Sequence, residues 1–177
     1  MIELKGISYQ SEGYHGVAQL LDSSFPPEER YPMERIMDLC RNPNIRLLGI
    51  WDGSEFCGFT LISVRRNTVY IFYLAIEEGK RSKGYGSKTI GLLERQYPGK
   101  GLVLNVEESD RDAPNYEQRI RRSSFYYRNG FKRMSIQMID DSGVYDILST
   151  SDRLDREEFM DIVTELGFDA YHVYLSE

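Results

Sequence analysis

The sequence predicts a single α/β domain, and three observations lead to this fold class. Residues 69–76 are all apolar or aromatic, which is the length and composition of a strand covered on both faces. A polar segment with glycines follows, and Ile90, Leu93 and Tyr97 then recur at helical spacing until Pro98-Gly99. With 177 residues, of which 41% are hydrophobic, the chain is large enough for one sizeable core.

The first third of the chain predicts one strand and two helices. Residues 2–9 alternate loosely and predict a short edge strand, and residues 11–25 and 33–40 predict the helices. The segment 26–32 separates the helices because it contains three prolines. The apolar faces are formed by Tyr14, Val17, Ala18, Leu21 and Phe25 in the first helix and by Met33, Ile36, Met37 and Cys40 in the second. We interpret the Met and Cys stripe as core.

The remaining two thirds predict strands joined by turns and further helices. A hairpin surrounds Asp52-Gly53-Ser54, and Asn67 leads into the strand 69–76. The helix that ends at Asn129-Gly130 is predicted to pack Tyr127 in the core. The predicted elements are strands at 46–51, 55–64, 69–76, 101–106, 131–139, 144–148 and 170–175, and helices at 85–97, 115–128 and 155–167.

Composition and charge exclude several classes of protein. The net charge of −6 and the pI near 5.1 argue against nucleic acid as a partner. The two cysteines and two histidines show no metal-ligand spacing, so no metal site is expected. No apolar run approaches the roughly 20 residues of a membrane span, and the N-terminus lacks a signal-peptide core. We therefore expect a reduced, soluble, cytoplasmic protein without a membrane partner.

The turn between the strand 69–76 and the next helix has the chemistry of a phosphate site. Residues 79–88 contain four basic side chains and no acid, so they carry +4 while the other residues sum to −10, which together give −6. Gly84 and Gly86 lack a Cβ, so backbone N–H groups at the helix start are open to an anion. A Rossmann fingerprint requires a third glycine where the chain has Thr89. A P-loop requires Lys and Ser/Thr at the positions of Tyr85 and Gly86.

Two motifs resemble the GCN5-related N-acetyltransferase (GNAT) superfamily. Arg81-Ser82-Lys83-Gly84-Tyr85-Gly86 is similar to its (Q/R)-x-x-G-x-(G/A) signature, and Phe125-Tyr126-Tyr127-Arg128-Asn129-Gly130-Phe131 is similar to its F-Y-x-x-x-G-F ending. The resemblance implies a mixed, predominantly antiparallel seven-stranded sheet flanked by helices over residues 1–150. Residues 151–177 then form a helix-strand extension packed on the same domain.

The resemblance also implies the site. Acetyl-CoA binds after the central strand, with its pyrophosphate on the backbone amides of the turn. Tyr126 protonates the departing CoA thiolate, because a phenol of pKa about 10 matches a thiolate of comparable basicity. The expected cofactor-binding residues are Leu74, Ala75, Ile76, Arg81, Ser82, Lys83, Gly84, Tyr85, Gly86, Ser87 and Asn115, with Asp110 as an alternative to Asn115.

The base and the residues that bind the acceptor amine have no motif of their own in the sequence. Some members of the superfamily carry a glutamate base on the fifth strand, where this chain has Asn105, so Glu107 on the same face is the substitute. A water relay or Tyr73 is an open alternative for the base. Glu28 and Glu29 lie between the first two helices, where they recognise a cationic amine or favour the next helix through its dipole. Glu28, Glu29 and Tyr73 are the predicted substrate-binding residues.

The predicted function is an N-acetyltransferase in which an amine attacks acetyl-CoA directly, without an acyl-enzyme. The acceptor is a small-molecule or peptide amine, and a homodimer is compatible with the fold. Two alternatives remain open: a non-catalytic acyl-CoA-binding regulatory module, and transfer of an acyl group other than acetyl.

Overall fold

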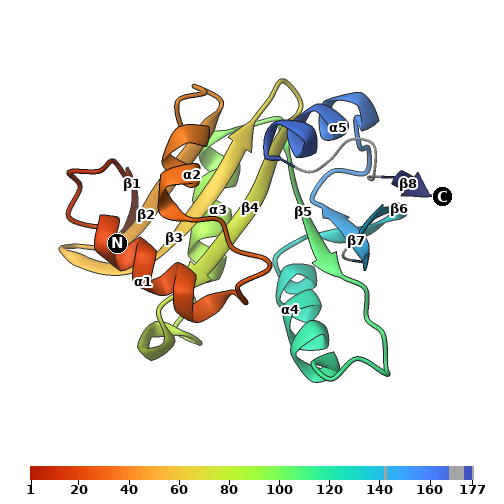
Figure 1. Ribbon diagram of the computed structural model, residues 1–177, viewed down its shortest axis with the longest axis horizontal. Helices are drawn as coiled ribbons and strands as arrows, with labels where there is room; N and C mark the ends of the chain where they lie inside the picture. The colour runs from red at the N-terminus through yellow and green to blue at the C-terminus, as the bar shows by residue number, and fades with distance from the viewer. Residues whose placement is uncertain (142, 168–173, 177) are drawn as a thin grey trace. The chain divides into compact units, whose positions relative to one another are not determined.

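The computed structural model describes residues 1–141, 143–167 and 174–176 (Figure 1). The chain divides into two compact units. The first unit comprises Met1–Val64 and Ile71–Pro98, and the second comprises Arg65–Tyr70 and Gly99–Glu177. The central strand β4, Thr68–Ile76, contributes residues to both units.

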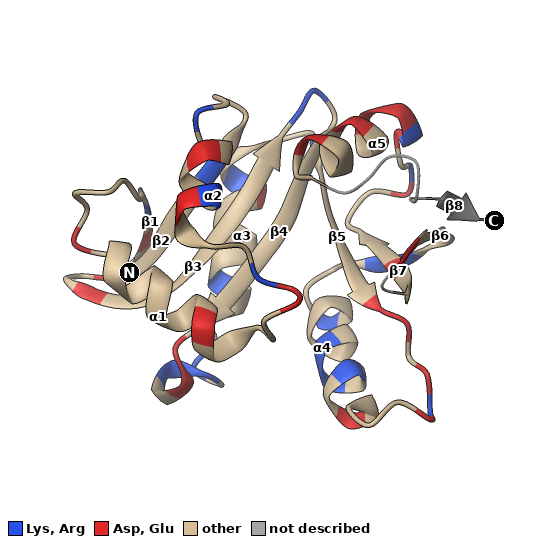
Figure 2. Cartoon of the chain, in the orientation of Figure 1, with Lys and Arg blue, Asp and Glu red and all other residues tan. Residues whose placement is uncertain are grey.

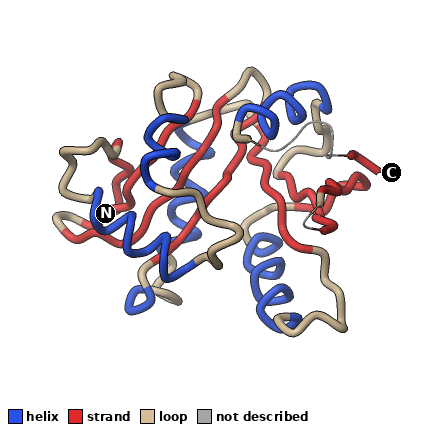
Figure 3. The backbone as a smooth tube through the Cα atoms, viewed as in Figure 1, coloured by secondary structure: helices blue, strands red, loops and turns tan. Residues whose placement is uncertain are grey.

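The sheet of the first unit begins with three antiparallel strands in the order β1, β2, β3. The last part of β4 follows β3 in the opposite direction, because Thr60 Oγ1 donates to the Tyr73 carbonyl at 2.8 Å and the Glu77 N–H donates to the Cys57 carbonyl at 2.9 Å. The elements are β1 Ile2–Gly6, α1 Tyr14–Ser24, α2 Met33–Leu39, β2 Ile45–Asp52, β3 Glu55–Val64, the 3-10 turn η1 Glu78–Lys80 and α3 Tyr85–Gln96 (Figure 3).

Helices cover both faces of the first unit's sheet. On one face, Leu74 and Ile76 of β4 pack with Tyr85 and Leu92 of α3 around the buried core of Ile2, Ile50 and Cys57. On the other face, the ring of Tyr73 lies 4.7 Å from that of Phe25, which directly follows α1. Adjacent strand residues point to opposite faces, so the uninterrupted apolar run of β4 reflects burial on both sides.

In the second unit, the beginning of β4 pairs in parallel with β5, and the other strands are antiparallel in the order β5, β7, β6, β8. The helix α5 packs on this unit: Phe159 is fully buried with its ring 5.8 Å from Tyr70, and Glu158 accepts a hydrogen bond from Thr68 Oγ1 at 2.7 Å. The elements are β5 Gly101–Glu107, α4 Tyr116–Arg128, β6 Lys132–Asp140, β7 Gly143–Ser149, α5 Arg156–Glu165 and β8 Tyr174–Ser176.

The predicted fold class is confirmed, since β1 to β7 form a mostly antiparallel mixed sheet with helices, and α5 and β8 follow as a helix and a strand. The N-cap predicted at Asp155 is present, because its Oδ1 accepts from the Glu158 N–H at 3.0 Å. Residues 170–173 of the predicted last strand lie outside the described residues. The division of the chain at 150/151 stays a prediction.

One packing prediction was wrong. Tyr127 is 45% exposed, whereas Ser123 and Tyr126 are the buried residues of α4. From Ser123, the next turn of the helix offers Tyr126 at i+3 and Tyr127 at i+4, and both spacings suit a buried face. The fold selects the first, because the Tyr126 ring packs 5.4 Å from Phe131.

Candidate active site

The turn that joins β4 to α3 presents backbone N–H groups to solvent. Gly84 is the N-cap of α3 and adopts a left-handed conformation with φ +82°, which favours glycine. The first hydrogen bond of the helix runs from the Lys88 N–H to the Gly84 carbonyl at 2.9 Å. The N–H groups of Tyr85, Gly86 and Ser87 precede it, so they have no acceptor within the helix. Such a helix start suits an anion.

The basic side chains of this turn divide into two kinds. Lys80 is only 15% exposed, and its ammonium lies 3.1 Å from a Glu55 carboxylate oxygen and 3.0 Å from one of Glu77. It also donates to the Phe56 carbonyl, so Lys80 attaches the turn to the β2–β3 hairpin. Arg81, Lys83 and Lys88 are exposed. Three cations, rather than the four of the sequence count, therefore face solvent here.

Tyr85 contributes its backbone to the turn, while its side chain has a separate partner. The hydroxyl donates to Asp52 Oδ2 at 3.0 Å, and this bond, together with lost hydration, raises the pKa of Tyr85 to about 12. The bond ties the first turn of α3 to the end of β2. Among the other predicted cofactor residues, Ser82 has φ +62° and is exposed, and the Ile76 carbonyl accepts from Arg81 Nε at 3.1 Å.

Two further predicted cofactor residues, Leu74 and Ala75, lie inside β4. Leu74 is half-buried among the apolar side chains that α3 covers, and Ala75 is buried. The Ala75 carbonyl approaches Gly58 of β3 so closely that a Cβ at Gly58 would lie 2.2 Å from its oxygen. Glycine at position 58 is therefore required for this part of the sheet to pair.

Tyr126 lies on the buried face of α4 in the second unit. Its ring packs 5.1 Å from Phe125 and 5.4 Å from Phe131 at tilted angles. Burial raises the pKa of Tyr126 to about 12, and the nearby Arg122 partly opposes that shift. Within the described ranges, no residue is placed to hydrogen-bond its hydroxyl. The hydroxyl is not one of the fully buried polar atoms that lack a partner, so water can reach it although the ring is buried.

Glu107 and Asn115, two of the predicted site residues, lie together at the junction of β5 and α4. Glu107 Oε1 accepts from Arg119 at 2.9 Å, and Oε2 lies 3.4 Å from Arg122 and 3.5 Å from the Asn115 amide. Arg119 also donates to Asn115 Oδ1 and to the Glu108 carbonyl, both at 2.8 Å. In Figure 2 the end of β5 and the loop after it are mostly acidic among their charged residues, whereas the charged residues of α4 are mostly basic.

Sequence reasoning missed the role of these arginines. Arg119, Arg122 and Tyr126 are spaced i, i+3, i+7, which places them on one face of α4. From the sequence, this spacing alone could have indicated that Tyr126 shares a helix face with Arg119 and Arg122, the two residues that hold Glu107.

The predicted substrate-binding residues meet in the first unit. The Tyr73 hydroxyl donates to the Glu29 carbonyl at 2.7 Å and accepts from the Tyr31 N–H at 3.1 Å. Burial raises the pKa of Tyr73 to about 12. Tyr73 therefore holds the segment between α1 and α2, on which the side chains of Glu28 and Glu29 are exposed.

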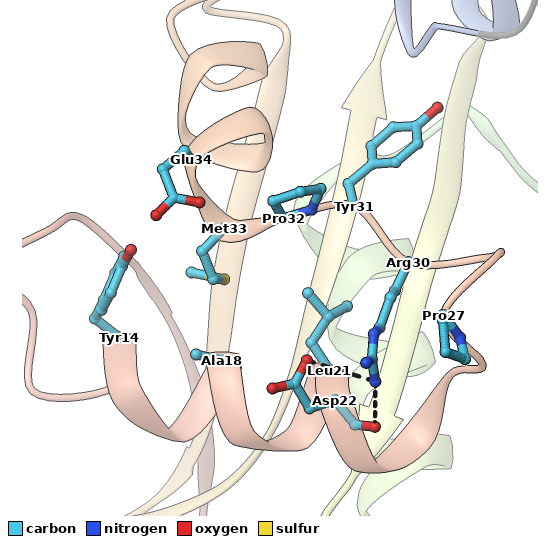
Figure 4. Close-up of a pocket in the computed structure, with 10 residues that line it drawn as sticks. All are labelled: Tyr14, Ala18, Leu21, Asp22, Pro27, Arg30, Tyr31, Pro32, Met33 and Glu34. Atoms are coloured by element: carbon cyan, nitrogen blue, oxygen red, sulfur yellow. Dashed lines mark hydrogen bonds and ion pairs between the residues drawn. The ribbon is translucent and has the colours of Figure 1, made fainter.

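The same segment borders a pocket of about 510 Å³ between α1 and α2, which the sequence did not predict (Figure 4).

The described residues contain no group of three or more His, Cys, Asp or Glu side chains that could hold a metal ion. None of their helices is long and apolar enough to cross a membrane.

Comparison with known proteins identifies the family. The model of the acetyltransferase (GNAT) family matches residues 14–121, which is more than half of the chain. The chain therefore belongs to the GNAT family of acetyltransferases, and the predicted enzyme class is confirmed. The match includes the turn and Glu107 but ends before Tyr126. No curated protein matches the sequence.

Solved structures agree on the fold. A GNAT-family protein from Bacteroides thetaiotaomicron is 23% identical, with a TM-score of 0.76 over 93% of this chain and 95% of that one. An aminoglycoside 6'-N-acetyltransferase complexed with coenzyme A is 15% identical, with a TM-score of 0.64 over 86% and 99%. The ribosomal-protein-S18-alanine N-acetyltransferase from Escherichia coli is 14% identical, with a TM-score of 0.59 over 87% and 96%. Acetyl-CoA, the predicted donor, is confirmed at the level of this family.

Proposed function

We propose that this protein transfers an acetyl group from acetyl-CoA to a primary amine by direct attack. The observation that carries the proposal is the start of α3, where the left-handed Gly84 opens three backbone N–H groups to solvent. These donors and the exposed Arg81, Lys83 and Lys88 fit a pyrophosphate, which needs several N–H donors and positive charge.

Acetyl-CoA supplies the acetyl group as a thioester, and Tyr126 is the proposed proton donor to the departing thiolate. Two properties of Tyr126 support this role: its ring is buried, and its hydroxyl has no partner within the described part of the chain. With a pKa of about 12 the phenol is protonated at neutral pH, as a proton donor must be, although burial makes it a weaker acid than an exposed tyrosine. A positioned acid of this kind contributes roughly 10²- to 10⁴-fold to a rate.

Glu107 is the proposed base that accepts a proton from the amine. Both carboxylate oxygens also meet guanidinium groups, at 2.9 Å from Arg119 and 3.4 Å from Arg122. Glu107 therefore also holds α4 to the end of β5. A substitution of Glu107 removes both the proposed base and this connection. We propose Asn115, which meets both Glu107 and Arg119, as a contact to the pantetheine arm.

The proposed acceptor is a cationic amine recognised by Glu28 and Glu29. Their carboxylates are exposed, and Tyr73 fixes the backbone that carries them. Among the similar structures, one is named for an aminoglycoside and another for an alanine of a ribosomal protein. Small-molecule and protein amines both occur as acceptors on this fold, and the two carboxylates favour an acceptor with positive charge.

Calorimetric titration with acetyl-CoA tests the site. The wild-type protein is expected to bind with micromolar affinity, and Gly84→Glu to weaken binding at least about tenfold, because it adds a carboxylate and a Cβ at φ +82°. Gly79→Glu is the matched control: it adds the same charge in the same turn, where a Cβ meets nothing within 4 Å and φ is not positive.

Binding that neither variant changes would remove the turn from the cofactor site. Binding with no turnover for any amine would replace the proposal by a non-catalytic acyl-CoA-binding module.

A further inference from the structure

The pocket between α1 and α2 is large enough for an organic ligand and lies wholly in the first unit. Its volume is about 510 Å³, within the roughly 300–1,000 Å³ typical of small-molecule sites. Its apolar lining includes Ala18 and Leu21 of α1 and Met33 of α2. Leu21 and Met33 are 2% and 8% exposed, so they form a fixed floor that belongs to the core.

At one end of the pocket, the charges of two lining residues neutralise each other. Arg30 Nη1 donates to the Asp22 carbonyl at 2.6 Å and lies 3.5 Å from the Asp22 carboxylate (Figure 4). It also reaches the Phe25 carbonyl at 3.4 Å. Arg30 and Asp22 therefore compensate each other and fasten the end of α1 to the following segment.

The other end carries an uncompensated negative charge. Glu34 opens α2 and is exposed, and within the described ranges no cation pairs with its carboxylate. Figure 4 shows the side chains of Tyr14 and Glu34 pointing toward one another at the mouth of the pocket. Loss of hydration, and secondly the charge of Glu34, raises the pKa of Tyr14.

This arrangement selects one class of ligand. A carboxylate beside a tyrosine ring attracts an ammonium group through charge, hydrogen bonding and the face of the ring. The apolar floor accommodates a hydrocarbon body that extends from the ammonium toward Leu21. An anionic ligand of the same shape would meet the charge of Glu34 with no free cation in the described lining.

We propose that the pocket binds an amphipathic primary amine, with its ammonium between Glu34 and Tyr14 and its hydrocarbon chain over Ala18, Leu21 and Met33. This binding does not rest on the proposed function, because Glu28 and Glu29, the residues proposed to recognise the acceptor, do not line the pocket.

Calorimetry without acetyl-CoA tests the binding. The probes are n-hexylammonium, n-hexanol and n-hexanoate, which share one chain and differ in charge. Hexylammonium is expected to bind about fivefold more tightly than hexanol, the most that one exposed ion pair allows, and hexanoate more weakly than both. Equal binding of the three probes would overturn the charge assignment.

Two variants locate the site, each with a matched control. Glu34→Gln is expected to weaken hexylammonium binding about fivefold, whereas Asp38→Asn, the same change one turn further along α2 and outside the pocket lining, leaves it unchanged. Ala18→Leu is expected to weaken it about tenfold or more by filling the floor, whereas Gln19→Leu on the exposed side of α1 does not. Equal effects of a variant and its control would overturn the location.

Addition of acetyl-CoA separates this proposal from the proposed function. Because the pocket is distinct from the acceptor recognition proposed at Glu28 and Glu29, Ala18→Leu is expected to weaken hexylammonium binding and to leave the acetylation rate of an amine substrate unchanged. A loss of acetylation that parallels the loss of hexylammonium binding would overturn the separation of the two sites. Hexylammonium binding without acetylation of any amine would leave the binding site standing and overturn the proposed function.

Discussion

In the turn at residues 77–88, the groups offered to a ligand are backbone N–H groups, whereas on α4 they are the side chains of one helix face. In the turn, Lys80 and Tyr85 hold the backbone to β3 and β2. On α4, the side chains of Arg119 and Arg122 hold Glu107, and the buried Tyr126 is the proposed acid. Substitutions that keep the backbone should therefore affect the two regions very differently.

The largest effect is expected from Tyr126→Phe. Removal of the hydroxyl takes away the proposed proton donor and leaves the ring packed against Phe125 and Phe131. We expect kcat to fall by roughly two decades or more, with the Kd for acetyl-CoA nearly unchanged. Tyr127→Phe, one residue further on an exposed position, is the control and should leave kcat unchanged. Equal rates of Tyr126→Phe and wild type would reduce Tyr126 to a core residue.

Glu107→Gln is expected to have the second largest effect, on both rate and stability. The amide cannot act as a base, so kcat should fall about tenfold or more. Loss of the charged partner of Arg119 and Arg122 should lower the free energy of unfolding by about 1–3 kcal/mol.

The control for this pair of roles is Glu108→Gln, whose carboxylate meets, among the described residues, the Gln137 amide at 3.3 Å and no cation. A Glu107→Gln protein that keeps its kcat while its Tm falls would show that Glu107 holds α4 to β5 and takes no proton.

A third effect concerns alkaline pH and compares Tyr73 of the first unit with Tyr126 of the second. Burial raises the pKa of each from 10.0 to about 12 in the folded state. Below pH 10 both states keep the protons and stability does not depend on these groups. Between pH 10 and 12 the unfolded chain loses protons that the folded protein retains, so stability falls as the pH rises.

Chemical denaturation at a series of pH values measures this fall. Tyr73→Phe and Tyr126→Phe should each make the fall in the free energy of unfolding between pH 10 and 12 less steep. Neither variant should change how the free energy of unfolding depends on pH near pH 7. If both variants kept the wild-type pH dependence of the free energy of unfolding between pH 10 and 12, burial would not raise the pKa of either phenol.

The smallest effect is expected from Tyr85→Phe, within the turn. The variant loses the hydrogen bond to Asp52 while the ring keeps its packing against the core, so only a small decrease in stability is expected. The backbone N–H of residue 85 remains, and the Kd for acetyl-CoA should change less than about twofold. A tenfold loss of affinity would show that the side chain itself contacts the ligand.

Much of the fold was predictable because its signals are local. The two-sided burial of β4, the Gly84 helix start and the Asp155 cap each depend on residues close together in the chain. The pocket between α1 and α2 was not predictable, although Ala18, Leu21 and Met33 were all expected to be apolar face residues. Periodicity shows which side of a helix is buried, and it does not show where two helices leave space between them.

The sequence by itself determined the class of enzyme and the glycine-bearing basic turn before α3. The turn depends on glycine positions and on a local cluster of basic residues, and backbone conformation follows from neighbouring residues. Only the tertiary structure decided which of two adjacent tyrosines is buried. It also decided that Lys80 forms ion pairs with Glu55 and Glu77, and that Glu107 meets Arg119 and Arg122. These outcomes depend on side chains from different elements, and only the packing of those elements brings such partners within reach of one another.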